Sequence, residues 1–256
     1  MRAVHHMKPG AAAGERTVCG NRRAWRRVML FAVLAGLAAL PWSFLGAVAA
    51  EQSKTPPKKD KYQWRDLFDG KTLKGWKAPN FGGEGKVEVR DGTIVIEMGD
   101  SMSGITWTGE FPKMDYEVTL EAKRLKGSDF FATTTFPVGD SHASFVVGGW
   151  GGTVVGISSI DHFDASENAT TKFATFKDNQ WYTIRIRVTK PKIECWIDDE
   201  KLVDFETKDH KISIRMECDL CRPFGIATWC TSAALRNIRV RNLPPQSEQA
   251  APHDKK

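Results

Sequence analysis

The stretch WYTIRIRVTKPKIECWIDDEKLVDFE, residues 181–206, decides the fold class. Its first part alternates strictly between two sides, one carrying Tyr182, Ile184, Ile186 and Val188, and the other Thr183, Arg185 and Arg187. Pro191-Lys192 then turns the chain into residues 193–198, where the alternation repeats, and a second turn at residues 198–201 leads into residues 202–206. A period of two residues is typical of a strand with one buried face. The stretch therefore predicts three antiparallel strands joined by tight turns.

Short apolar or alternating runs continue on both sides of this stretch. Asp91-Gly92 joins residues 87–89 to residues 93–97 as a two-residue hairpin turn. Further strands are predicted at residues 116–124, 130–138, 143–150, 153–160, 224–230 and 234–243. No segment outside the first 50 residues keeps a helical period over about 12 residues. The sequence thus predicts one all-β domain, an antiparallel β-sandwich or jelly roll.

The first 50 residues have the pattern of an export signal. Four arginines at positions 22, 23, 26 and 27 precede an apolar run over residues 28–40, and Pro41 and the small residues 47–50 follow it. The alternative is a membrane anchor, but the run is shorter than the roughly 20 residues of a span. We expect cleavage near Ala49 or Ala50, an exported (periplasmic or extracellular) protein, and no stable membrane span after processing.

Composition divides the chain into four parts. We predict a signal peptide with a basic N-terminus at 1–50, a polar linker at 51–61, the β-sandwich domain at 62–243 and a disordered tail at 244–256. The whole net charge of +6 lies in the first part, so the rest of the chain is neutral. A neutral body lacks the basic field that binds nucleic acid or a polybasic membrane surface, and we expect neither partner.

Four cysteines remain once Cys19 leaves with the signal peptide: Cys195, Cys218, Cys221 and Cys230. The Cys218-x-x-Cys221 spacing lacks the second matching pair of a zinc site and the βαβ setting of a thioredoxin-like motif. Two interpretations stay open, namely a local disulfide and two ordinary thiols in a connection between strands.

Three segments carry a family resemblance. They are DLFDGKTLKGW at residues 66–76, the pair WYTIR (181–185) and CWIDD (195–199), and LRNIRV at residues 235–240. They resemble the 3-keto-disaccharide hydrolase domain family, which is 3-keto-glucoside lyase/hydratase-like and was formerly a domain of unknown function. The resemblance implies a jelly roll of the concanavalin A-like lectin/glucanase type, export from a bacterial cell, and carbohydrate as the partner. Residues 127–131 and 219–225 depart from the family pattern, so no catalytic residue is carried over.

The loop SSIDHFDASEN, residues 158–168, is the first candidate site. Elimination from a 3-keto sugar needs a base near the C2 proton and a group that holds the enolate charge. We predict Asp161 and His162 as catalytic residues, Asp164 and Glu167 as ligands of Ca²⁺ or a similar divalent cation, and Asn168 as a substrate contact. The alternative is a solvated acidic loop.

Two further candidates would bind the substrate. Trp150, within GGWGG at residues 148–152, would stack on a pyranose face; its alternative is a bulged hairpin whose tryptophan plugs the sandwich end. Arg185, Arg187, Glu194 and Trp196 lie on adjacent strands and would line a sugar groove, and the alternative is a solvated face with cross-strand ion pairs. One strand, about 25 Å long, separates Trp150 from the acidic loop. Contact between them requires that loop to fold back over the sheet.

The histidines do not predict a metal site. His142 and His210 fall in turns, and His253 lies in the tail. The family resemblance favours an exported hydrolase or lyase that acts on 3-keto-glycosides or related sugars. The alternatives are a non-catalytic lectin-like carbohydrate-binding module and a laminin-G-like adhesion domain.

Overall fold

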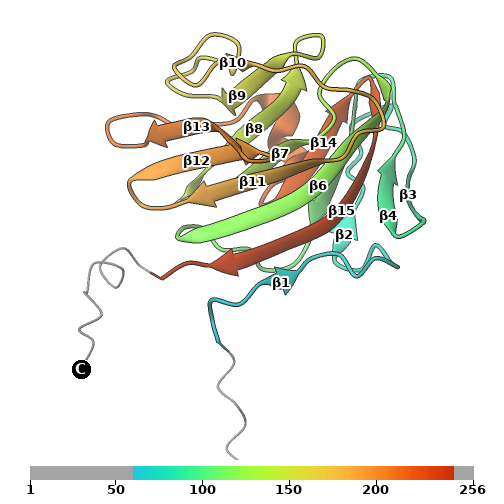
Figure 1. Ribbon diagram of the computed structural model, residues 1–256, viewed down its shortest axis with the longest axis horizontal. Coiled ribbons are helices and arrows are strands. Elements are labelled where there is room, and N and C mark those ends of the chain that lie inside the picture. Colours follow the sequence, from blue (N-terminus) through green and yellow to red (C-terminus); the bar gives the residue numbers. More distant parts are fainter. Residues whose placement is uncertain (1–59, 245–256) are drawn as a thin grey trace, which may run out of the picture. The chain divides into compact units, whose positions relative to one another are not determined.

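The computed structural model describes residues 60–244, and they form two antiparallel β-sheets packed face to face (Figure 1). This confirms the predicted all-β sandwich. The predicted signal peptide, the tail after Pro244 and all but the last two residues of the linker lie outside the described residues. Among the described residues, no helix is long and apolar enough to cross a membrane.

The eight-stranded sheet has its strands in an order unlike that of the sequence. In spatial order it contains β13 (Glu200–Glu206), β12 (Lys192–Ile197), β11 (Tyr182–Val188), β6 (Tyr116–Gly127), β15 (Thr231–Asn242), β4 (Thr93–Ile96) and β3 (Val87–Arg90), with β1 (Arg65–Asp66) paired to β15. The stretch at residues 181–206 supplies β11, β12 and β13, as its alternation predicted. The two central strands, β6 and β15, come from distant parts of the chain.

The seven-stranded sheet faces it across the core (Figure 1). Its spatial order is β10 (Lys172–Phe173), β9 (Val154–Ser158), β8 (Ser141–Gly149), β7 (Thr133–Val138), β14 (Gly225–Trp229), β5 (Met102–Trp107) and β2 (Trp76–Lys77). The single helical segment of the described chain, the 3₁₀ helix η1 (Met216–Cys221), connects β13 to β14.

The core lies where the apolar alternate residues of both sheets meet. Tyr116, Val118, Leu120 and Ala122 of β6 are buried, as the alternation predicted, and they join Ile184 and Ile186 of β11 in one cluster. The seven-stranded sheet contributes Phe136, Phe145 and Ile226 to the same cluster. Because side chains alternate across a strand, the residues between these positions point away from the core. In the seven-stranded sheet they form the surface on which the candidate site lies.

The segment at residues 66–76 anchors the first short strands. Asp69 accepts hydrogen bonds from the Lys71 and Thr72 amides at 2.8 and 2.7 Å and from the Thr72 hydroxyl, which lowers the pKa of its carboxyl to about 2. The Trp76 indole donates to the Leu67 carbonyl oxygen at 2.8 Å and its ring packs against Trp107. This family-like segment therefore has a structural role as a turn and a core anchor.

Several predicted details need correction. The strand predicted at residues 153–160 ends at Ser158, and the one predicted at 130–138 begins at Thr133. His142 lies in β8 and not in a turn; burial lowers the pKa of its half-buried imidazole, and the Arg222 charge lowers it further. All four cysteines of the described residues are free thiols, and Cys218 and Cys221 are both on η1.

Candidate functional site

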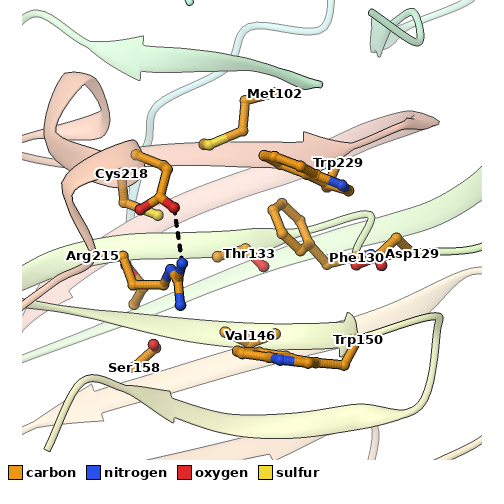
Figure 2. Close-up of a pocket in the computed structure, with 12 residues that line it drawn as sticks. Met102, Asp129, Phe130, Thr133, Val146, Trp150, Ser158, Arg215, Cys218 and Trp229 are labelled. Carbon is orange, nitrogen blue, oxygen red and sulfur yellow. Dashed lines mark hydrogen bonds and ion pairs between the residues drawn. The ribbon is translucent and has the colours of Figure 1, made fainter. Parts of the chain in front are cut away.

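A cavity of about 230 Å³ lies on the outer face of the seven-stranded sheet (Figure 2). We call it the groove. Its lining comes from five strands, three connections and η1, and consists of Met102, Asp129, Phe130, Thr133, Ser144, Val146, Trp150, Ser158, Arg215, Glu217, Cys218 and Trp229. The floor residues Thr133, Ser144, Val146 and Ser158 are the outward members of β7, β8 and β9. Small side chains at most of these positions leave room above the sheet.

One end of the groove is aromatic (Figure 2). Trp150 is 46% exposed at the β8–β9 turn, which follows a β-bulge between Val147 and Gly149. Phe130 and Trp229 lie with ring centroids 6.3 Å apart. Flat apolar rings of this kind suit the C–H face of a sugar.

Asp129 holds the aromatic end in shape. Its carboxylate accepts a hydrogen bond from the Gly151 amide at 2.8 Å and another from the Phe130 amide at 2.7 Å. Trp150 has a left-handed φ of 49°, which is uncommon for a bulky residue. The Asp129 carboxylate thus fixes the turn that presents the Trp150 ring.

The other end of the groove is polar, and Arg215 is at its centre (Figure 2). Its guanidinium forms ion pairs with Asp164 and, at 2.8 Å, with Glu217. The hydrogen bond from Arg215 holds the pKa of Glu217 below its ordinary value, and the Glu217 carboxylate raises the pKa of Arg215. Ser158 and Ser159 donate to the other Asp164 oxygen at 3.1 and 3.2 Å. Two carboxylates, one guanidinium and two hydroxyls therefore form one connected network.

The segment η1 closes this polar end. The Thr106 hydroxyl of β5 donates to the Leu220 carbonyl oxygen at 2.8 Å. At Gly225 of β14, an added Cβ would lie 2.6 Å from the Cys221 carbonyl oxygen. The backbone of η1 thus lies directly on the sheet, and this close contact positions Glu217 and Cys218 on the groove wall.

Thr133 stands out on the groove floor. It is only 2% exposed, and its hydroxyl oxygen has no hydrogen-bond partner in the described structure. A buried hydroxyl without a partner loses its hydration and gains nothing in return. A ligand hydroxyl in the groove would supply the missing partner.

The structure places Trp150 in the groove lining and brings Asp164 to the groove's edge through Arg215 and Ser158; the sugar contact of Trp150 stays a prediction. The acidic loop does not fold back to Trp150. Instead, residues on the segment between β13 and η1 connect the loop to the groove. Arg215 is the residue that makes this connection.

The other acidic-loop residues lie outside the groove lining. Asp161 accepts from the Lys211 amide at 2.8 Å and contacts the His210 imidazole at 2.6 Å, and the Lys211 ammonium lies 3.3 Å from the His162 ring. His210 directly follows the turn at residues 208–209, where the sequence placed it, but the sequence did not reveal its contact with Asp161. Asn168 donates to the Ile157 and Asp164 carbonyl oxygens at 2.7 and 2.8 Å. These residues hold the loop to its neighbours.

The predicted cation ligands do not form a ligand cluster. Within residues 60–244, no group of three or more His, Cys, Asp or Glu side chains could hold a metal ion. Asp164 is engaged with Arg215 and two serines, and Glu167 is exposed. The described residues bring no third ligand of these types to Asp164 and Glu167, and the cation assignment stays a prediction.

Arg185, Arg187, Glu194 and Trp196 lie together, but on the outer face of the eight-stranded sheet. Trp196 is 7% exposed beneath the Arg185 guanidinium, which lies 3.8 Å from its ring centroid. Arg187 lies 3.6 Å from Glu194 and 3.3 Å from the buried Glu117. Cross-strand ion pairs and cation–π contacts thus use this face, and none of the four residues lines the groove.

Sequence reasoning missed most of the groove. Asp129, Phe130, Thr133, Arg215, Glu217 and Trp229 come from segments that no motif distinguished. Trp229, at the end of a predicted strand, had the aromatic character of a sugar contact, but its neighbours were unknown. Arg215 and Glu217 lie in a short connection whose position depends on η1.

Comparisons with known proteins agree with this architecture. The sequence model of one protein family, described as a 3-keto-alpha-glucoside-1,2-lyase-like domain, matches residues 63–241. The solved structure of the Crh5 transglycosylase in complex with NAG is 14% identical, with a TM-score of 0.51 over 72% of this chain and 85% of that one. The carbohydrate-binding module CBM66 from Bacillus subtilis is 14% identical, with a TM-score of 0.43 over 66% and 96%. No curated protein sequence matches the chain. At 14% identity the similarity to the transglycosylase shows the fold alone.

Proposed function

The chain belongs to the 3-keto-alpha-glucoside-1,2-lyase-like family, and from this membership we propose that it eliminates the C1 substituent of 3-keto-glycosides bound in the groove. The observation that carries the proposal is the groove itself, with aromatic rings at one end, a charged network at the other and the unpartnered Thr133 hydroxyl between them. Sugars combine an apolar C–H face with a polar edge, and this lining offers a surface for each.

The chemistry follows from the ketone. A carbonyl at C3 acidifies the C2 proton, and a carboxylate base removes it while the electron pair forms an enolate. We assign the base to Glu217, because it lines the groove whereas Asp161 does not. The enolate oxygen would lie against the Arg215 guanidinium, a fixed positive charge. The enolate then re-forms the C3 carbonyl, its electron pair makes a C1=C2 double bond, and the C1–O bond breaks. The leaving oxygen takes up the proton that Glu217 removed from C2, directly or through water.

The fixed pairing of Arg215 and Glu217 serves both steps of this mechanism. The guanidinium keeps Glu217 ionised, and it is close enough to share its charge with a developing enolate. A lowered pKa makes Glu217 a weaker base, but the ketone reduces the demand on it. No step requires a metal ion at Asp164 and Glu167.

One observation favours a second candidate function, a lectin-like carbohydrate-binding module. Asp129 and Glu217, the two carboxylates of the groove lining, already have partners within the described residues. A binding site needs only shape and hydrogen bonds, whereas a base needs a free lone pair at the reacting proton. The two functions therefore differ in turnover and not in binding.

The discriminating experiment offers 3-keto-glucosides and plain glucosides to the parent and to Trp150→Ala. Calorimetry measures binding, and chromatography of the released C1 substituent measures turnover. Trp181→Ala is the matched control, because Trp181 packs under Lys123 and Arg236 and does not line the groove. We expect Trp150→Ala alone to lose binding.

The outcome separates the functions. Turnover that falls at least about 100-fold in Glu217→Gln, with binding retained, supports the elimination. Binding without turnover in the parent supports the lectin-like module. If neither class of sugar binds at millimolar concentration, both proposals fail and the adhesion-domain alternative is the one left.

Export is the remaining part of the proposal. The arginine cluster at residues 22–27, the apolar run 28–40 and the small residues before Glu51 support cleavage near Ala49 or Ala50. The mature protein would then meet sugars outside the cytoplasm, in the periplasm or beyond the cell.

A further inference from the structure

We propose that Cys218 and Cys221 form a disulfide that fastens η1 against the seven-stranded sheet beside the groove. Both are free thiols in this structure. The proposal does not depend on sugar binding or on turnover, so it can fail or succeed independently of the proposed function.

The backbone geometry brings the two side chains together. Cys218 and Cys221 are three residues apart on a 3₁₀ helix. In such a helix residues i and i+3 eclipse one another, and three steps of about 2 Å separate their Cα atoms by about 6 Å along the axis. Disulfides span Cα separations of about 4.4–6.8 Å, so this spacing needs no rearrangement of the chain.

The side chains share one environment. Both side chains belong to the small buried cluster with Met102 and Ala227; burial raises the pKa of both thiols, and the Thr135 hydroxyl opposes that rise in both. The Thr135 hydroxyl itself lies 2.9 Å from the Ser144 hydroxyl on the sheet surface. Burial in one small cluster places both thiols on the side of η1 that packs against the sheet.

The other two cysteines of the described residues lie away from this cluster. Cys195 is fully buried in the main core, and the Cys230 thiol contacts the Asp100 carbonyl oxygen at 3.4 Å after β14. Neither belongs to the cluster that contains Cys218 and Cys221. The pairing is therefore specific to η1.

The reaction needs an external disulfide as oxidant, and oxidised glutathione supplies one. The Cys218 thiol lines the groove and reacts first: its thiolate attacks one glutathione sulfur and releases the first reduced glutathione. The Cys221 thiolate then attacks the Cys218 sulfur and releases the second. Two thiols lose two protons and two electrons, and one glutathione disulfide becomes two thiols.

Burial sets the speed of this exchange. It raises the pKa of both thiols, so the folded protein exchanges slowly and the bond forms more readily while the chain folds. Once formed, the bond is shielded from reductants in the same way. That behaviour is typical of a structural disulfide in an oxidising compartment.

The bond would act on the groove through η1. Glu217 precedes Cys218 and holds Arg215, and the Cys221 carbonyl lies against Gly225. Linking residues 218 and 221 locks the turn between these two contacts. The oxidised protein should therefore melt at a higher temperature than the reduced protein.

The test counts thiols. The full chain is refolded with oxidised and reduced glutathione and then denatured. One sample is alkylated with iodoacetamide directly and another after reduction, and mass spectrometry counts the labels on each. We expect two fewer labels on the unreduced chain, and a tryptic peptide that joins Cys218 to Cys221. An equal number of labels in both samples, or a bond to another cysteine, would overturn the proposal.

Matched variants make the assignment specific. Cys218→Ser and Cys221→Ser should each abolish the two-label difference, whereas Cys230→Ser should keep it. The count on the parent needs no variant, so a variant that fails to fold does not weaken the test. A two-label difference that persists in Cys221→Ser contradicts the proposed pairing.

Discussion

At the scale of single residues, Thr133 is a buried residue of the groove whose hydroxyl has an unmet hydrogen bond. The residue is buried in the groove floor, and its hydroxyl has no partner. Thr228 of the same sheet also has a buried hydroxyl without a partner, but it does not line the groove. Comparing the two residues therefore distinguishes the stability cost of a buried, unpartnered hydroxyl from its contribution to sugar binding.

We predict that Thr133→Val weakens sugar binding by about 3- to 10-fold, the equivalent of one hydrogen bond of about 0.5–1.5 kcal/mol. Its melting temperature should be unchanged or higher, because valine has a similar shape and no hydroxyl to desolvate. Calorimetric titration and thermal unfolding measure the two effects. Thr228→Val should show the stability effect alone; equal losses of affinity in both variants would contradict a direct contact.

Asp161 connects the acidic loop to the segment after β13 through hydrogen bonds with His210 and Lys211. Its hydrogen bond with His210 and the one from the Lys211 amide hold the pKa of its carboxyl below the ordinary value of 3.8. A carboxyl whose pKa is lower in the folded state stabilises the protein above its unfolded pKa, and this stabilisation is lost as the pH falls through the folded pKa.

We predict that Asp161→Asn lowers the melting temperature at neutral pH and that the gap to the parent closes as the pH falls below about 4. Asparagine tolerates the left-handed φ of 51° at this position, so the change tests charge. Asp209→Asn is the control, since Asp209 also has a positive φ of 63° and forms no ion pair in the described structure. A gap that persists unchanged at pH 3 would show that Asp161 acts through its shape.

At the scale of elements, η1 owes its position to a glycine on the strand beneath it. Gly225 begins β14, and an added Cβ would lie 2.6 Å from the Cys221 carbonyl oxygen and 2.9 Å from its Cα. Backbone atoms cannot rotate away as a side-chain end can. Any larger residue at position 225 must therefore lift η1, and Glu217 with it.

We predict that Gly225→Ala destabilises the protein by about 1–3 kcal/mol and weakens sugar binding at the polar end of the groove. Gly70→Ala is the control, because Gly70 has a φ of 74° and open space around its missing Cβ. It should cost stability through backbone strain of about 1–2 kcal/mol and leave binding unchanged. Denaturant unfolding and calorimetry distinguish the two; normal binding by Gly225→Ala would show that η1 does not form the site.

At the same scale, the polar face of the eight-stranded sheet carries ion pairs and cation–π contacts between its strands. Glu117 of β6 is 2% exposed and lies 3.3 Å from Arg187 and 3.1 Å from Arg241 on its two neighbouring strands. Trp196 and Trp181 carry cationic side chains over their rings. Stacked charges and rings of this kind cover the sheet, so its polar positions serve pairing between strands.

At the scale of the whole molecule, the basic first 50 residues differ from the rest of the chain, which has no net charge. All of the net charge of +6 lies in the first 50 residues. The described residues 60–244 contain both sheets and the groove. The export signal in the first 50 residues stays a prediction, and the proposed site lies within residues 60–244.

We predict that the exported form begins at Ala50 or Glu51, because residues 22–50 carry the three regions of a signal peptide. N-terminal sequencing of protein recovered from the periplasm or the medium measures the cleavage point. Replacement of Ala47 and Ala49 by bulky residues should block processing, since the peptidase accepts small residues there. Recovery of an intact, membrane-embedded parent chain would contradict export.

The fold was predictable from the sequence because strand alternation is a local property. Residues 181–206 already showed which side chains of β11 and β12 face the core, and the hairpin at Asp91-Gly92 joined the predicted strands. The backbone geometry of a strand imposes a period of two whatever the tertiary contacts. The aromatic turn at Trp150 was likewise identifiable, because glycines surround it.

The groove was decided only by the tertiary structure. Arg215 follows Thr133 by 82 positions in the sequence, and Trp229 follows it by 96. The three residues meet because β14 lies between β7 and β5 and because η1 folds over that sheet. No local period records which strands become neighbours, since that choice depends on the burial of all strands together. The amino-acid sequence by itself determined an all-β sandwich of a recognisable family. The packing of η1 and the order of the strands decided where the groove lies.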